Sequence, residues 1–310
     1  MRSSNVQQFL QAQLSGPLRG VLLLFLLLGG IGNLRGEAST SAALENALRK
    51  LVDGKPFTVG FAVKDLVSGE ELSVGADQPF RAGAMVRLPL LVELYRRAAA
   101  HEFSLDEARE LPDAARSVRG GILRLMHGDT FRMSLRDYAL FMIVLNDPTA
   151  TRYIADLVGM ERTSEAMKQL GSPEFQCVRR GRDRVSAEAT PISVVRLLER
   201  IHSGSVIDHA TSVEILAVLA NERVGLHRMS VPRGVEYAGI SSGPIPGRRC
   251  EAGVVFLPGR PYVFCGFVSR NDRDGMMKRQ RGGLPEEDRI LAEAMRLVHE
   301  HFSGLSGIAP

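Results

Sequence analysis

The amino-acid sequence predicts an α+β fold, in which an antiparallel five-stranded sheet is flanked by helices and joined to an all-helical lobe. Two strand-like segments lie near the start of the chain and three lie near its end. Between them, from about residue 85 to 220, apolar residues recur mostly at helical spacing. Terminal segments that pair into one sheet would form a single folding unit with two lobes, and ligands usually bind between lobes.

The first part of the chain alternates between helix and strand patterns. Residues 39–52 place several leucines on one side of an amphipathic helix. Thr58–Leu66 is rich in residues that favour strands, and Ser68-Gly69 turns it into a second strand at Glu70–Val74. We expect these two strands to form a hairpin.

Prolines and glycines divide the middle of the chain into helices. The strongest helical patterns cover Ser134–Leu145, Pro148–Val158, Glu161–Leu170, Pro191–Ile201 and Ser212–Ala220. Strand patterns return at Val235–Ser241, Glu251–Leu257 and Tyr262–Val268, with Pro258-Gly259 between the last two. A final helix runs from the acids after Pro285 to about Phe302, because carboxylates favour the positive end of a helix.

The stretch Phe80–Tyr95 predicts a loop of small residues that leads into a core helix. One apolar helical face is formed by Leu88, Leu91, Val92 and Tyr95. A helix of this kind is a common way to hold a nucleophile, yet the sequence from Phe80 to Leu91 contains neither a hydroxyl nor a thiol. Instead it offers Ala84 in the loop and Arg87 in the next turn, so the setting of an active site lacks the reactive groups.

Composition and charge argue against several kinds of site. The chain has 310 residues, 45% of them apolar, and a net charge of +4. Without residues 1–38 the net charge falls to +2, because that segment holds three Arg and one Glu. We therefore expect no nucleic-acid partner. The seven His and three Cys residues show no metal-ligand spacing, and we expect neither a metal nor a cofactor.

Strand geometry gives an expectation for two of the cysteines. If Leu257 and Pro261 flank the turn of the last hairpin, then Cys250 faces Val268. Since side chains alternate between the faces of a sheet, Cys250 and Cys265 would then point to opposite sides. We expect no disulfide between them.

The amino-terminal segment predicts export. Val21–Gly32 is an uninterrupted apolar run of about 12 residues, preceded by Arg2 and Arg19, which fits a signal peptide better than a spanning helix of about 20 residues. A signal peptide or a short membrane anchor at residues 1–38 would leave residues 39–310 as the folded domain. Both alternatives place that domain outside the cytoplasm.

Three stretches, in order along the chain, resemble the motifs of one enzyme superfamily. Phe80–Leu91 is similar to a Ser-x-x-Lys helix, Met142–Thr151 to a Ser-Asp-Asn region and Ser241–Arg248 to a Lys-Thr-Gly strand. We call them the first, second and third motif frames. With them, residues 42–303 resemble the class A β-lactamase and penicillin-binding serine hydrolase superfamily. The resemblance implies a β-lactamase-like fold with an active site where the three frames meet.

The matching catalytic positions hold other residues. In this family the motif serine is the nucleophile and the motif lysine assists it, but these positions are Ala84 and Arg87. A methyl group cannot attack a carbonyl, and a guanidinium cannot act as a base at neutral pH. The other altered positions are Asn146, Asp147 and Pro148 in the second frame and Ser241, Ser242 and Gly243 in the third. The family's omega-loop glutamate, with an asparagine four residues on, has no counterpart, since the glutamates there are Glu174 and Glu188 and neither has that asparagine.

The altered residues have simple structural interpretations. Asp147 would cap a helix that begins at Pro148. Gly243 would allow the close approach of neighbouring backbone in a strand. A buried Arg87 needs a partner, and we expect either an ion pair with Asp147 or Glu188, or a role in binding the carboxylate of a ligand.

Three hypotheses follow for function. The first is an exported, catalytically inactive protein that binds a small ligand or an envelope protein through the former active site, with Arg248 and Arg249 on its rim. The second is an active hydrolase of β-lactams or peptidoglycan-like amides that uses unusual residues such as Ser242. The third is a purely structural envelope domain. Membership of a superfamily does not decide between them.

Overall fold

One antiparallel sheet joins segments from both ends of the chain. The computed structural model describes residues 41–116, 120–126, 131–180, 184–243, 245–271 and 283–306. The order of the strands across the sheet is β2 (Glu71–Val74), β1 (Phe57–Asp65), β10 (Tyr262–Arg270), β9 (Arg248–Phe256) and β8 (Glu236–Ser241). Every neighbouring pair is antiparallel. The predicted five-stranded sheet and the α+β fold are therefore confirmed.

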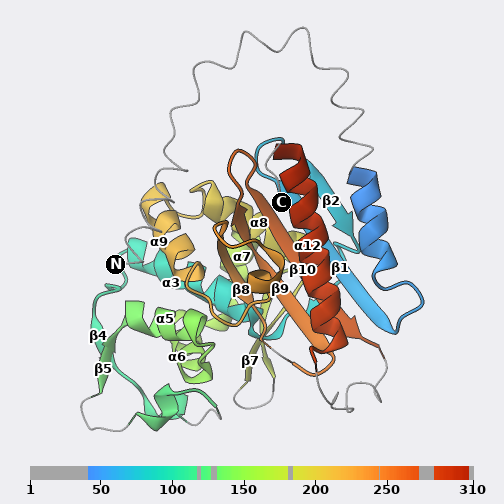
Figure 1. Cartoon of the computed structure of the whole chain (residues 1–310). Helices are drawn as coiled ribbons and strands as arrows, with labels where there is room; N and C mark the ends of the chain where they lie inside the picture. Colours follow the sequence, from blue (N-terminus) through green and yellow to red (C-terminus); the bar gives the residue numbers. More distant parts are fainter. Residues whose placement is uncertain are drawn as a thin grey trace, which may run out of the picture.

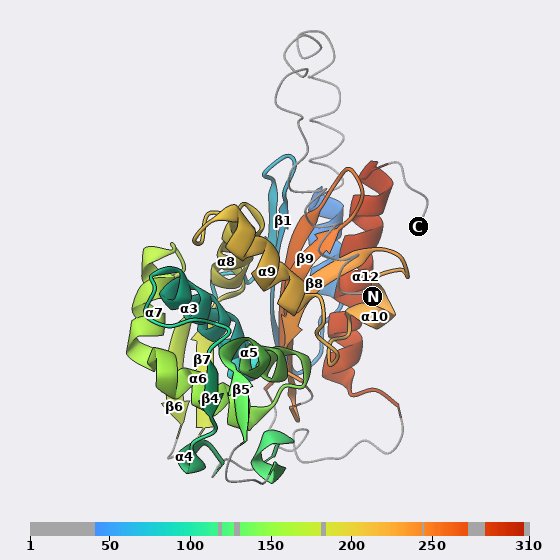
Figure 2. The same cartoon turned by 90° about the vertical axis from the view of Figure 1, so that its left-hand side faces the viewer.

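Both faces of the sheet are covered, which is why its central strands are apolar almost throughout. On one face lie the helix at residues 41–50 and α12 (Glu286–Ser306), which packs on β9 and β10 (Figure 1). On the other face, α8 (Pro191–His202) packs on β1, β9 and β10, and the rest of the helical lobe lies beyond it (Figure 2). Alternate residues of β1, β9 and β10 thus enter two separate cores.

The helical lobe follows the predicted order. Its longer helices are α3 (Arg87–Ala99), α5 (Leu135–Val144), α6 (Pro148–Val158), α7 (Met160–Gln169) and α9 (His209–Leu219). Shorter turns of helix are η1 (Gly83–Val86), α4 (Asp113–Arg116), η2 (Leu123–Leu125) and α10 (His227–Ser230). Across the residues that the structure describes, no helix is both long and apolar enough to cross a membrane. The predicted signal peptide or anchor at residues 1–38 lies outside the described residues.

The prediction of an all-helical middle was wrong at two places. A hairpin of β6 (Gln176–Arg180) and β7 (Arg184–Ala189) pairs with β3 (Phe80–Arg81), and β4 (Ala108–Glu110) pairs with β5 (Arg132–Ser134). These strands are short and contain many charged residues, so they lack the apolar alternation that marks a strand in a sequence. The β6–β7 hairpin occupies the region where the family has its omega loop.

The predicted register of the last hairpin was wrong by one residue. Arg260 N donates to Leu257 O at 3.0 Å, so Pro258 and Gly259 are the central residues of a four-residue turn. Cys250 therefore lies opposite Phe267, and Cys265 opposite Ala252. Both cysteines belong to the core under the helical lobe, on the same face of the sheet rather than on opposite faces. Both thiols are free in the structure.

Candidate functional site

The second motif frame is a helix start built around one buried carboxylate. Asp147 is fully buried, and its Oδ1 accepts hydrogen bonds from Thr149 N at 2.8 Å and Ala150 N at 3.1 Å. Its Oδ2 accepts from Ile122 N at 2.6 Å and Leu123 N at 3.1 Å. The predicted cap is confirmed, with Pro148 as the first residue of α6. Because four backbone N–H groups already use the carboxylate, Asp147 does not pair with Arg87.

Arg87 joins the three motif frames through backbone carbonyl groups. Its side chain is fully buried at the start of α3. Nε donates to Ala84 O at 2.8 Å, and Nη1 donates to Met142 O at 3.0 Å and Ile143 O at 3.1 Å. Nη2 donates to Ser241 O. One guanidinium therefore holds the first, second and third frames together.

The expectation that Arg87 forms an ion pair with Asp147 or Glu188 was wrong. Glu188 pairs with Arg180 on the β6–β7 hairpin, and the carboxylate of Asp147 accepts hydrogen bonds from backbone N–H groups. Burial lowers the pKa of Arg87 to about 10, and the negative charge of Glu222 opposes that shift. At neutral pH the guanidinium stays charged. With its donors directed at four carbonyl oxygens, Arg87 is not arranged to bind the carboxylate of a ligand.

The carboxyl end of α5 explains why backbone carbonyl groups are available to Arg87. The last four C=O groups of an α-helix lack intrahelical partners. Met142 and Ile143 are in the last turn of α5, so the guanidinium caps this carboxyl end and adds a positive charge where the helix dipole favours it. The backbone N–H of Asp147 caps Phe141 O in the same turn, at 3.1 Å.

The third frame leaves the sheet in a tight turn whose hydroxyl groups are occupied. Ser241 is fully buried, and its Oγ accepts from Gly243 N at 3.1 Å. Ser242 Oγ donates to Gly243 O at 2.9 Å and accepts from Cys250 N at 3.2 Å. Both hydroxyls thus stabilise the turn between β8 and β9, and Ser242 is only 4% exposed.

Gly243 lies just after the end of β8 rather than within a strand, which corrects its predicted setting. Its φ of 71° is in the left-handed region that favours glycine. A Cβ at this position would lie 2.9 Å from Asn146 Nδ2. Asn146 itself has a φ of 51°. The expected close approach was that of neighbouring backbone, but the group next to Gly243 is the Asn146 side chain, which brings the second and third frames into contact.

The first frame places Ala84 in the short helix η1, directly before α3. Ala84 is partly exposed, whereas Met85 and Val86 are buried. Ile245 lies over this frame, since a Cβ on Gly83 would lie 3.3 Å from Ile245 Cδ1. Six of the predicted positions are linked by these contacts, namely Ala84, Arg87, Asn146, Ser241, Ser242 and Gly243. Asp147 and Pro148 follow Asn146 in the chain.

The two glutamates of the omega-loop region are engaged with arginines. Glu174 pairs with Arg196 at 3.9 Å, and Glu188 pairs with Arg180. Next to Glu188 on β7, Ala187 O accepts from Ala82 N at 2.9 Å, which ties the hairpin to the first frame. Neither glutamate is therefore free to activate water at the frame.

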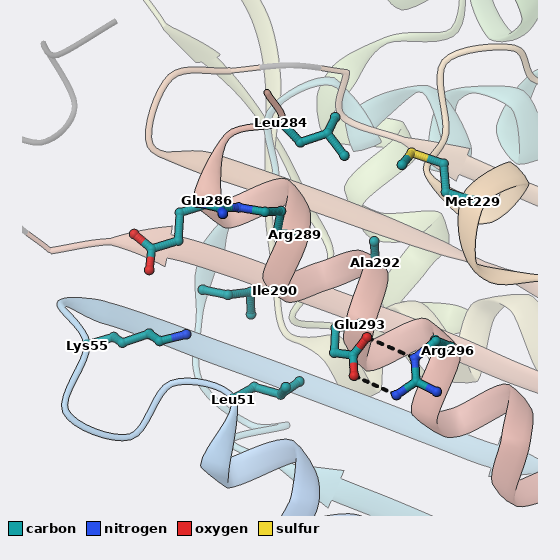
Figure 3. Close-up of a pocket in the computed structure, with 10 residues that line it drawn as sticks. All are labelled: Leu51, Lys55, Met229, Leu284, Glu286, Arg289, Ile290, Ala292, Glu293 and Arg296. Carbon is teal, nitrogen blue, oxygen red and sulfur yellow. Dashed lines mark hydrogen bonds and ion pairs between the residues drawn. The ribbon is translucent and has the colours of Figure 1, made fainter. Parts of the chain in front are cut away.

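A separate groove lies on the far face of the sheet. It has a volume of about 520 Å³ and is formed where the end of the amino-terminal helix, α10 and α12 meet (Figure 3). Its centre is apolar, with Leu51, Met229 and Ile290, and the pair Glu293–Arg296 lies along one side. None of the eight motif positions lines it. The groove is therefore not the candidate site.

Comparisons with known proteins decide the family. A family model described as "Beta-lactamase enzyme family" matches residues 43–302. The chain belongs to the β-lactamase enzyme family. The resemblance seen in the three motif frames is confirmed. A search of curated proteins gave no match.

Solved structures of β-lactamase family proteins show the same fold. A β-lactamase from Sphaerobacter thermophilus is 21% identical, with a TM-score of 0.71, and the match covers 88% of this chain and 98% of that one. A protein titled PBP-A is 22% identical, with a TM-score of 0.74, covering 84% and 96%. A class A β-lactamase from Mycobacterium abscessus is 19% identical, with a TM-score of 0.71, covering 84% and 99%. At these identities the likeness establishes the fold and not the activity.

Within this β-lactamase family fold, sequence reasoning found the altered positions but missed what they bind. The partners of Arg87 are main-chain oxygens, which every residue carries, so no residue type in the sequence could have marked them. The peptide groups of Ile122 and Leu123 that bind Asp147 were missed for the same reason. The one available signal was the fixed charge of Arg87 at the start of an apolar helix.

Proposed function

We propose that this chain is an exported, catalytically inactive member of the β-lactamase family, which binds a small ligand or an envelope protein where the three motif frames meet. The observation that carries the proposal is the position of Arg87. At the site of the family's lysine lies a buried guanidinium whose three nitrogens each donate to backbone carbonyls. Such a group stabilises the site and cannot take up a proton from a nucleophile.

The remaining hydroxyl groups argue against the alternative of an active hydrolase with unusual residues. Ala84 cannot carry an acyl ester. Ser241 and Ser242 are buried, and their hydroxyl groups are used within the turn that contains them. A serine nucleophile also needs a neighbouring base, and the two hydroxyls instead form hydrogen bonds with the backbone of Gly243 and Cys250. In a comparable serine hydrolase, loss of the nucleophile alone costs about 10⁶ in rate.

The first test is covalent labelling by a penicillin. After prolonged incubation we expect no mass adduct on the natural protein, and none on Ala84→Ser, because the new hydroxyl would lie beside a permanent cation. In Ala84→Ser, Arg87→Lys, a lysine is available to assist the serine, and we expect a slowly formed acyl-enzyme that persists because the omega-loop glutamate is missing. Intact-protein mass spectrometry measures the adduct, with an active class A β-lactamase as the positive control.

The outcome that decides against the proposal is an adduct on the unmodified chain. Peptide mapping would then identify the residue that carries it, and Ser242 would be the first to examine. Turnover of a chromogenic β-lactam by the unmodified chain would support the active hydrolase directly. A chain with neither turnover nor any saturable ligand would favour the purely structural domain.

The second test concerns export, which rests on the apolar run Val21–Gly32. A fusion of residues 1–60 to a reporter that is active only outside the cytoplasm should give signal, and replacing Leu24 and Leu27 with aspartate in the same fusion should abolish it. Reporter signal confined to the cytoplasm, with a reporter that works there, would refute export while leaving the argument about catalysis intact.

A further inference from the structure

A row of polar residues crosses the inner face of the sheet at its end. Thr58 on β1 lies opposite Ser269 on β10, and Ser269 lies opposite Arg248 on β9. This is the end of the sheet where β1 begins and β10 ends, at the bottom of Figure 1. On the same face, two residues further into the strands, the row is Gly60, Phe267 and Cys250, and the side chains of Phe267 and Cys250 lie in the core under the helical lobe. The polar row is thus the first one outside the core.

The polar row forms one wall of a hollow of about 320 Å³. The hollow is lined by Thr58, Pro79, Phe80, Arg81, Arg248 and Ser269. Phe80 closes it toward the core, because its ring stacks on Phe267 with 5.1 Å between centroids. Arg81, on β3, and Arg248, on β9, come from different sheets. Two arginines from separate elements therefore line one space, and the Phe80 ring forms its apolar floor.

Among the residues that the structure describes, the hollow carries positive charge without a counter-ion. No carboxylate is among the described residues that line it. Within the described ranges neither Arg81 nor Arg248 forms an ion pair, while Glu188, which lies opposite Arg81 in the β3–β7 pairing, is held by Arg180. By contrast, Arg249 and Arg270, which flank the same strand ends, pair with Asp288 and Glu286. Unlike these two neighbouring arginines, Arg81 and Arg248 thus have no ion-pair partner among the described residues.

The hydrogen-bonding groups of the hollow fit an oxyanion. Each guanidinium offers a planar fork of N–H donors that matches phosphate or carboxylate oxygens. The Thr58 hydroxyl already donates to Asn271 Oδ1 at 2.8 Å, whereas the half-buried Ser269 hydroxyl donates to no acceptor seen among the described residues. Two positive charges that line one space favour a dianion over a monoanion. We propose that this hollow binds the phosphoryl group of a phosphate monoester or of an equivalent phosphorylated ligand.

The hollow adjoins the motif frames without coinciding with them. No hydrogen bond seen between described residues joins Arg81 or Arg248 to Ala84 or Arg87, although Arg81, Arg248 and Ser242 line a smaller space beside the hollow. The ligand of the hollow would approach from the end of the sheet, beside Arg248, the first residue of β9. Phosphate binding reports on the hollow and penicillin labelling reports on the catalytic positions, so failure of one proposal is distinguishable from failure of the other.

The test is calorimetric titration of the folded domain with inorganic phosphate, glycerol phosphate and acetate at low ionic strength. We expect saturable binding of both phosphates, weaker binding of acetate, and a loss of about tenfold or more in affinity for Arg81→Gln and for Arg248→Gln. The matched control is Arg49→Gln, which removes an exposed arginine from the helix at residues 41–50 and should leave affinity unchanged. Circular dichroism checks that each variant is folded.

Two further arms complete the design. Flotation with vesicles of phosphatidic acid in phosphatidylcholine, compared with phosphatidylcholine alone, distinguishes a lipid headgroup from a free phosphate as the source of the ligand. The proposal would be overturned if Arg81→Gln and Arg248→Gln bound phosphate with the same affinity as the unmodified chain. The absence of saturable phosphate binding at low ionic strength in the folded, unmodified chain would overturn it as well.

Discussion

Replacing Arg87 with methionine should destabilise the domain by about 3–5 kcal/mol, the magnitude expected when a buried charged partner is removed from its hydrogen-bonding groups. Methionine fills part of the volume but donates no hydrogen bond. The carbonyls of Ala84, Met142, Ile143 and Ser241 would lose this donor inside the protein. The measurement is equilibrium urea unfolding, in which the loss appears as a lower midpoint.

The controls separate the hydrogen bonds from the charge. Arg87→Lys keeps the charge but cannot reach all four carbonyls with one ammonium group, so its stability should lie between those of the natural protein and Arg87→Met. Arg49→Met, at an exposed position, should keep the midpoint of the natural protein. A loss below about 1 kcal/mol for Arg87→Met would mean that the frames hold together without the guanidinium.

Asp147→Ala should cost about 2–4 kcal/mol, because one carboxylate serves four backbone N–H groups in two segments. The variant loses the cap of α6 and releases the segment at Ile122 and Leu123. Asp147→Asn should recover part of the loss, since its amide keeps one acceptor oxygen but turns an NH₂ group toward two N–H donors. Urea unfolding again gives the size of each change.

A matched cap in the same lobe provides the control for Asp147. Asp208 caps α9 by accepting from Thr211 N at 2.7 Å, binds no second segment as Asp147 does, and lies at the surface. Asp208→Ala should cost about 1 kcal/mol, as for an ordinary cap. If Asp147→Ala costs no more than Asp208→Ala, the bonds to Ile122 and Leu123 contribute nothing measurable, and Asp147 is only a helix cap.

Prediction from the sequence was most accurate where residues close together in the chain determine the secondary structure. The bounds of α6 were predicted to the residue, because Asp147 and Pro148 mark its start and Gly159 follows its end. The core strands were found because both faces of the sheet are buried. The hairpin β6–β7 was missed because its pairing depends on β3, about a hundred residues earlier in the chain, and on polar residues with no strand pattern.

The errors at the site have a different cause. The register of the last hairpin depended on which two residues occupy the centre of the turn, and choosing Leu257 and Pro261 as its flanks instead of Leu257 and Arg260 moved every partner by one. For Arg87, the residue type correctly indicated that a buried charge needs partners, but we predicted that those partners would be carboxylates. Only the three-dimensional arrangement shows that main-chain oxygens satisfy the charge.

The central position of β10 has a consequence for how the protein is made. Thr58 and Asn271, at the junction of β1 and β10, form a hydrogen bond between their side chains although they lie 213 positions apart in the chain. During synthesis, the hairpin of β1 and β2 must wait for nearly the whole chain to emerge before its partner exists. Until then it presents a bare strand edge that other chains can join. A product truncated before Tyr262 would keep two small, unconnected sheets, β2–β1 and β9–β8, and we expect such fragments to aggregate rather than to fold.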